Sequence, residues 1–254
     1  MLSNQPLSFV ARWHLHRVAW FTLAALVVSL GRTSAHAFPA LMTEGHADIG
    51  VAFAPFEMEA HVHAGATVDG IVLAADQEFE PDELIFQVAH IQSAPLDNSL
   101  DFTGATPGAP LWVLPESFIP GIPFVGISSE HLDSNDWVGD LTWKVNAITA
   151  PPGGVFSMWT DGLLGPQVSV STQDGLPDQF QLPVGSHNHF NYGFSHLGLY
   201  TVTFEVSGTH VTDGFQTVTG TYSFAAVPEP GTISLAGFAI GWLALALRRR
   251  AVGN

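Results

Sequence analysis

The chain has 254 residues, no cysteine, and 23 acidic against 7 basic residues, which give a formal net charge of −16. Without cysteine, disulfides, thiol catalysis and thiolate metal sites are excluded, so a folded domain must rest on hydrophobic burial and any metal site on His and carboxylates. The acidity excludes nucleic acid as a partner, because it repels phosphate backbones and attracts cations; solubility alone is the competing explanation for it.

The N-terminal segment 1–37 has the features of a secretory signal peptide in the usual order. Two arginines precede the apolar run 18–30, and Ala35 and Ala37 then form a small-x-small site. We therefore expect signal peptidase to cleave after Ala37. An uncleaved anchor is the alternative, but the apolar run is short for a helix that spans a bilayer.

Residues 38–226 are predicted to form one acidic, antiparallel β-sandwich, because alternating apolar and polar residues recur there and helical periodicity is nearly absent. The clearest prediction is a hairpin of strands 48–53 and 56–63 around a tight turn at Ala54-Pro55. Further strands are expected at 67–73, 84–89, 111–114, 141–148, 155–159, 167–171, 198–207 and 215–224. Short strands without intervening helices favour two packed sheets.

The histidines of this domain are unevenly distributed and suggest a metal site. Two His-x-His pairs occur, and residues i and i+2 of a strand point to one face, so each pair can offer two imidazoles to one ion. The candidate ligands are His46, His61, His63, His187, His189 and His196. With Asp48 or another carboxylate they would suit a divalent metal such as zinc, and we predict that the two pairs meet at a shared edge of the sandwich.

Several alternatives remain open for these residues. His61 and His63 also fit the wet face of an amphipathic strand, and His189 is close in sequence to aromatic residues against which it could simply pack. Asp133, Asn135 and Asp136 resemble part of a calcium loop but lack the glycine and the distal glutamate of the EF-hand pattern.

The C-terminal segment 227–254 carries Pro228-Glu229-Pro230, an apolar stretch at 232–247 and then Arg248, Arg249 and Arg250. The stretch is expected to form a membrane helix, with the arginines on the cytoplasmic side. In this order the features resemble the PEP-CTERM sorting signal. The resemblance implies recognition by an exosortase, a membrane enzyme of Gram-negative bacteria that make exopolysaccharide. An ordinary single-span anchor is the alternative.

A second resemblance lies in the domain itself. Three blocks resemble the choice-of-anchor M surface proteins and, in the last block, the surface-anchored repeat of actinobacterial wall proteins: 45–51 with 61–63, 111–115 with 126–130, and 185–208. This resemblance implies a surface location and gives no established biochemical activity.

We therefore expect an exported protein at the cell surface or the outer face of a Gram-negative envelope, membrane-anchored at least before sorting. The leading hypothesis is a non-enzymatic binding domain that holds a divalent metal, since the common hydrolase and nucleotide-binding motifs are missing. The alternatives are a module that binds exopolysaccharide on exposed tryptophans and, less favoured, a metal-dependent hydrolase. The four tryptophans considered for glycan stacking are Trp112, Trp137, Trp143 and Trp159.

Overall fold

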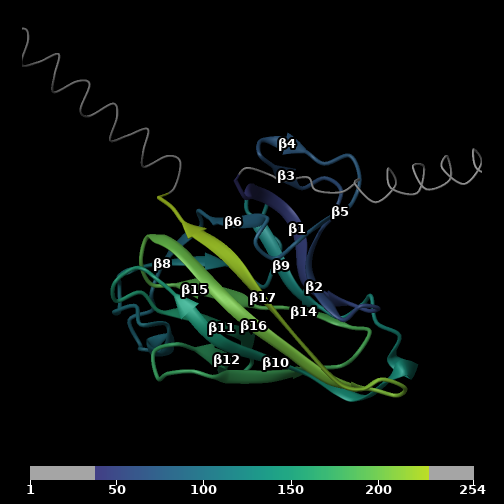
Figure 1. Ribbon diagram of the computed structural model, residues 1–254. Coiled ribbons are helices and arrows are strands. Elements are labelled where there is room, and N and C mark those ends of the chain that lie inside the picture. The colour runs from purple at the N-terminus through teal and green to yellow at the C-terminus, as the bar shows by residue number, and fades with distance from the viewer. Residues whose placement is uncertain (1–37, 229–254) are drawn as a thin grey trace, which may run out of the picture. The chain divides into compact units, whose positions relative to one another are not determined.

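The computed structural model describes residues 38–228, and these residues form an all-β domain (Figure 1). Apart from two short 3-10 turns, η2 (Asp101–Thr103) and η3 (Ser134–Asp136), the described part contains no helix, and so none long and apolar enough to cross a membrane. The expected signal peptide and most of the C-terminal segment, including its apolar helix, lie outside the described residues.

The strands form two sheets, of twelve and five strands. The larger sheet contains β1 (Ala40–Ala52), β2 (Glu57–Val62), β3 (Thr67–Val68), β4 (Ile71–Val72), β5 (Gln77–Phe79), β6 (Leu84–Val88), β9 (Pro123–Ser128), β10 (Trp137–Thr149), β13 (Asp178–Leu182), β14 (His187–His189), β16 (Gly198–His210) and β17 (Gly214–Ala226). The smaller sheet contains β7 (Ile91–Ser93), β8 (Pro110–Leu114), β11 (Phe156–Gly162), β12 (Gly165–Ser171) and β15 (Asn191–Phe194).

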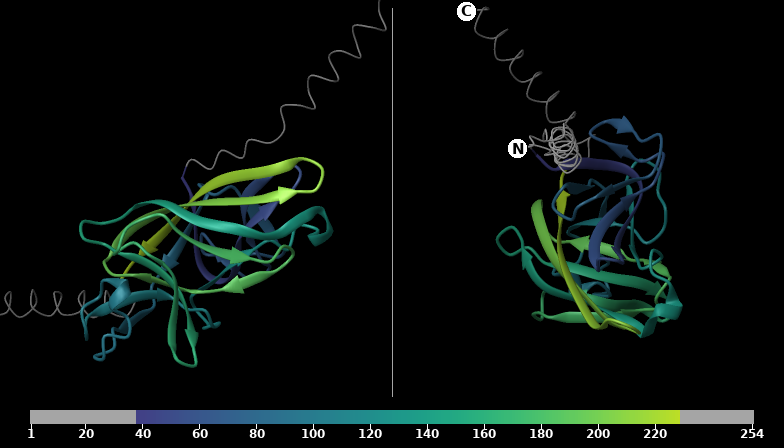
Figure 2. Two further views of the ribbon diagram at one scale, coloured as in Figure 1. Left: turned by 90° about the horizontal axis from the view of Figure 1, so that it is seen from below. Right: turned by 45° about the vertical axis from the view of Figure 1, so that its right-hand side comes forward.

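The two sheets pack face to face around an aromatic core. Phe224 of β17 lies 6.1 Å from Phe156 of β11 and 5.3 Å from Phe194 of β15, measured between ring centroids, and all three are fully buried. The long β16–β17 hairpin, the green-to-yellow ribbon in Figures 1 and 2, spans the body and carries alternate buried residues into this core. Such alternation is what packs one face of a sheet and leaves the other wet.

The prediction of a purely antiparallel sandwich is wrong in one respect, because the larger sheet is mixed. Strand β1 runs parallel to β6 over its first residues and parallel to β9 from Gly45 to Gly50, and β17 also runs parallel to β6. Parallel neighbours need long connections, and many residues separate β1 from both partners. An alternating pattern shows which face of a strand is buried but not the direction of its neighbour.

Most expected strands are present, with shifted ends, and the hairpin of β1 and β2 is confirmed. The strand expected at 67–73 is instead a small hairpin of β3 and β4, in which Asp69 and Gly70 have positive φ values of 50° and 75°. Positive φ values at both central residues define a type I′ turn, which Asp-Gly favours. This dipeptide therefore indicated a hairpin that the prediction of a single strand missed. Six strands were not predicted, all six residues or shorter: β5, β7, β9, β13, β14 and β15.

Candidate metal centre

The candidate site lies on one face of five neighbouring strands of the larger sheet, in the order β5, β2, β1, β9, β14. Asp48 stands in the middle of this face. It is opposite His61 of β2 on one side and Gly126 of β9 on the other, and Gly126 is opposite His189 of β14. Pairing across the strands thus puts an aspartate and a member of each His-x-His pair in one row.

A second row runs beside the first and adds more imidazole. His63 lies directly after β2, and its backbone N–H donates to the backbone oxygen of His46 at 3.0 Å. The His46 and His63 rings are stacked, with centroids 4.3 Å apart and planes 2° from parallel. Residues two apart in a strand share a face, so His46 and Asp48 point the same way.

The opposite face of the same strands is apolar. Ile49, Ala60 and Ile127 are fully buried there and belong to the main core. The face with the histidines is therefore fixed by hydrophobic burial on the other side, because a slip of one residue would turn the apolar set outward. The core holds the site in register without contributing to its chemistry.

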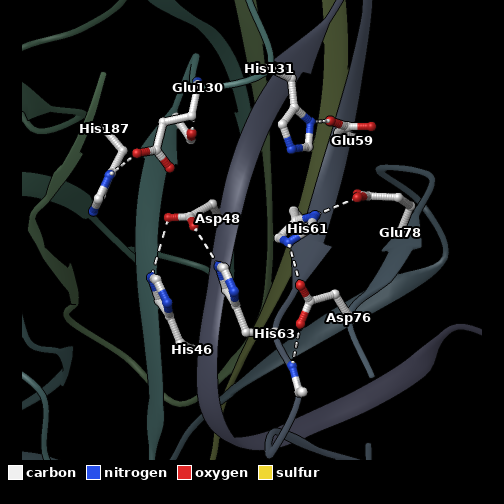
Figure 3. A network of polar contacts seen from close by, with 12 residues as sticks. His46, Asp48, Glu59, His61, His63, Asp76, Glu78, Glu130, His131 and His187 are labelled. Atoms are coloured by element: carbon white, nitrogen blue, oxygen red, sulfur yellow. Dashed lines mark hydrogen bonds and ion pairs between the residues drawn. The ribbon is translucent and has the colours of Figure 1, made fainter. Parts of the chain in front are cut away.

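Asp48 is the chemical centre of the cluster (Figure 3). Its Oδ2 lies 3.1 Å from Nε2 of His63 and its Oδ1 lies 3.4 Å from Nε2 of His46, while the residue is only 3% exposed. The three ligand atoms that His46, Asp48 and His63 can offer lie within 4.8 Å of one another. Neutral imidazoles and a carboxylate at this spacing suit a divalent metal of the zinc type.

The Asp48 carboxyl is ionised although it is buried. Burial alone would raise its pKa, but the neighbouring His46 and His63 and, through its charge, His187 outweigh burial and lower the pKa of Asp48 to about 2. A buried carboxylate requires a nearby positive charge and hydrogen-bond partners. Oδ1 of Asp48 and Nε2 of His46 contact each other at 3.4 Å, and neither atom has another partner among residues 38–228.

His189 is held as a neutral imidazole beside this carboxylate. Its ring stacks on Phe124 with centroids 3.7 Å apart and lies 5.1 Å from the His46 ring. Burial, followed by the charge of His46, lowers the pKa of His189 to about 4. Its Nδ1 is buried and has no hydrogen-bond partner within the described part of the chain.

Gly126 allows Asp48 to lie over strand β9. A Cβ on this glycine would stand 2.1 Å from Oδ1 of Asp48 and 3.1 Å from Cε1 of His189. Since real Cβ atoms do not approach a neighbour so closely, any side chain here would displace the carboxylate. A glycine in a strand often marks such a close approach.

The remaining predicted candidates divide between this face and the rest of the molecule. His187 belongs to the cluster: its ring lies 6.3 Å from that of His46, and its Nδ1 lies 3.0 Å from Oε1 of Glu130. His196 does not. It lies between β15 and β16, where its backbone N–H donates to the Tyr200 hydroxyl and its Nδ1 is 2.8 Å from the Ser195 hydroxyl.

The residues behind two alternative hypotheses have structural roles. All four tryptophans considered for glycan stacking are buried, at 9% exposure or less, so they form no exposed platform for the alternative of glycan binding. Asp133, from the suspected calcium loop, accepts the backbone N–H of Asn135 at 2.9 Å and caps η3. This cap is an ordinary structural use of Asp.

Several site residues were missed from the sequence. Glu59, Asp76, Glu78, Glu130 and His131 also contact the histidines of this face. Glu59 lies two residues before His61 on β2, but the others lie on unpredicted strands or on loops. Only the pairing of β2 with β5, and the placing of 130 and 131 after β9, brings them to this face.

Comparison with known proteins identifies the C-terminal segment and leaves the domain unassigned. The model of the PEP-CTERM protein-sorting motif matches residues 226–250. This motif implies export, membrane anchoring before sorting and recognition by an exosortase. No curated protein and no solved structure gives a significant match, so the resemblance to choice-of-anchor M proteins has no support from these comparisons.

Proposed function

We propose that this protein is a non-enzymatic surface protein whose β-domain binds a divalent transition metal, with zinc as the best fit, through His46, Asp48 and His63. His189 and His187 lie beside these ligands and supply further imidazole. The observation that carries the proposal is the buried, ionised Asp48 carboxylate, whose Oδ1 lies 3.4 Å from Nε2 of His46, while neither atom has another partner among residues 38–228. A metal ion would satisfy these groups together.

A protonated imidazole is the competing explanation for the buried charge. One imidazolium from His46 or His63 would balance Asp48 without any metal. It would still leave Nδ1 of His189 without a partner among residues 38–228, because the low pKa of His189 keeps that ring neutral. The surrounding acidic surface favours the metal, since it raises the local concentration of cations.

The proposed location follows from the sorting motif. We propose display on the outer face of a Gram-negative envelope, where the acidic domain meets environmental metal ions. Replacing the three arginines at 248–250 by glutamine should reduce surface display, because the positive-inside signal is lost. Protease accessibility on intact cells measures this effect, and unchanged display would contradict it.

Zinc titration of the purified, chelator-treated protein tests the binding proposal. Asp48→Asn keeps the shape of the side chain but removes the charge, so it should remove one bound zinc per chain in isothermal titration calorimetry and metal analysis. His196→Gln is the matched control, because His196 lies outside the cluster, and it should bind zinc like the wild type. Zinc binding by Asp48→Asn equal to that of the wild type would overturn the proposal.

A further inference from the structure

A second group of metal-ligating side chains lies on the same face, next to the Asp48 cluster. His61, Glu78 and His131 each offer one ligand atom, and these atoms lie within 4.8 Å of one another. We propose that these three residues form a second divalent cation site of the zinc type. This second site goes beyond the proposed site at Asp48. The two sites share no ligand, so each can be tested without the other.

His61 is oriented by carboxylates on both sides (Figure 3). Its Nδ1 contacts Oε1 of Glu78, the residue opposite it on β5, and its Nε2 lies 3.7 Å from Oδ2 of Asp76. Asp76 is itself fixed, because its Oδ1 accepts the backbone N–H of Ala64 at 2.8 Å. The proposed ligands His61 and Glu78 thus lie on adjacent strands. The Asp76 carboxylate is the outer partner that orients the His61 ring.

His131 comes from the segment after β9 and completes the group. Its Nδ1 lies 2.6 Å from Oε1 of Glu59, which leaves Nε2 to act as the ligand atom. Its ring is nearly perpendicular to that of His61, at 85°, with centroids 5.2 Å apart. A carboxylate that holds one nitrogen of an imidazole so that the other can ligate is the usual outer partner of a metal-bound histidine.

Glu59 is well placed for this outer role. It is on the same face of β2 as His61, and its side chain is 16% exposed. Its backbone oxygen accepts the buried Tyr222 hydroxyl at 2.9 Å, which ties this point of β2 to β17. Two imidazoles and one carboxylate with an outer carboxylate are the ligand set of zinc sites that keep a fourth position open.

The two sites are adjacent and face a common cavity of about 150 Å³. The cavity is lined by groups of both sites, among them Asp48, Glu59, His61, His63, Glu130 and His131. The His61 and His63 rings are 4.6 Å apart, so two dications would repel each other, while the surrounding carboxylates offset part of that repulsion. We therefore expect the site of the buried Asp48 to fill first and the second site to bind more weakly.

Zinc stoichiometry of the purified full chain tests this proposal by calorimetry and metal analysis after dialysis. The wild type should bind two zinc ions. The double variant Glu78→Gln/His131→Gln should lose the weaker ion and keep the tighter one, which also shows that it is folded. Glu59→Gln should weaken the second ion by about 10–100-fold, the usual effect of removing an outer partner. Glu57→Gln, on the same strand face but outside the group, is the charge-matched control and should keep both ions.

The outcomes separate the two sites. If the wild type binds one ion that only Asp48→Asn removes, the second site is overturned and the first stands. If it binds one ion that only Glu78→Gln/His131→Gln removes, the second site stands and the proposed function through Asp48 fails. Two ions that the double variant retains, or loss of the weaker ion from Glu57→Gln, would also overturn the second site.

Discussion

Two regions of the domain place histidine against aspartate, and they use the contact in opposite ways: the histidine is buried at His210, whereas the aspartate is buried at Asp48. His210, at the end of β16, is 7% exposed; its Nδ1 lies 2.7 Å from Oδ2 of Asp213 and 3.1 Å from the Thr212 hydroxyl. Its ring packs against Phe53 and Trp137. Around Asp48, by contrast, buried imidazole nitrogens and a carboxylate oxygen lie together without hydrogen-bond partners within residues 38–228.

The difference shows that burial of a histidine is not the mark of a ligand. His210 is satisfied by its local turn and contributes to the packing of the domain. Around Asp48 the fold brings together groups of β1 and β14, and it leaves Asp48 Oδ1, His46 Nε2 and His189 Nδ1 without hydrogen-bond partners among residues 38–228. Because unsatisfied buried polar atoms are costly, such an arrangement is expected where a ligand completes it.

The largest expected effect is stabilisation by zinc. A ligand that binds only the folded state stabilises it by about 4 kcal/mol when its free concentration is a thousand times Kd. Added zinc should therefore raise the melting temperature of the wild type and of the His210→Phe variant. Asp48→Asn should lose most of this shift in a thermal melt. An equal shift in Asp48→Asn would erase the distinction between the two regions.

The next effect is a pH dependence of the metal-free protein. The pKa of His189 falls from 6.5 to about 4 on folding, chiefly through burial. The unfolded state therefore binds more protons between these values, and stability is lost as the pH falls from about 6.5 to 4, by up to about 3 kcal/mol. His189→Gln should flatten this part of the curve in urea titrations with chelator present. His196→Gln should leave it unchanged, and an unaltered slope in His189→Gln would contradict the assignment.

A smaller effect is expected from adding one methyl group under Asp48. Gly126→Ala places a Cβ 2.1 Å from Oδ1 of Asp48, so it should cost about 2 kcal/mol of unfolding free energy and weaken zinc binding. Gly50→Ala is the matched control on the adjacent strand, because its nearest neighbour would be 3.8 Å away. Chemical denaturation of both variants measures the difference. Equal stability of the two would show that the carboxylate can move freely.

The sequence predicted the all-β class and much of the strand set because apolar alternation reports directly which face is buried. It could not predict the direction of β1 beside β9, since both parallel and antiparallel neighbours satisfy the same alternation. That pairing decides the site. It places Gly126 beside Asp48, and β14 then adds His189.

The histidine pairs were visible as a pattern, but their partners were not. His46, His61, His63, His187 and His189 lie together on one face, whereas His196 was indistinguishable from them by spacing alone. Nothing in the local sequence of His131 or Glu78 indicates proximity to His61, because the contacts depend on a short edge strand and on a loop. Zinc binding itself remains a prediction.

The smallest expected effect on stability is in the His210 region. It tests the prediction that His210 is a packing residue and not a ligand. His210→Phe keeps an aromatic ring against Phe53 and Trp137 but removes Nδ1, which contacts the Thr212 hydroxyl and accepts the backbone N–H of Asp213 at 3.3 Å. Asp213 is well exposed and can be solvated by water, so the loss should be near the net value of one hydrogen bond, about 1 kcal/mol. Zinc affinity should not change, because no atom of this region contributes to the proposed sites.

His46→Phe keeps a ring but removes a proposed ligand, so it should abolish zinc binding at the Asp48 site. Calorimetric titration of both variants with zinc, under one set of conditions, measures this contrast. Weakened zinc binding in His210→Phe, or normal zinc binding in His46→Phe, would contradict the prediction. A missing hydrogen-bond partner would then not distinguish the histidines that bind metal.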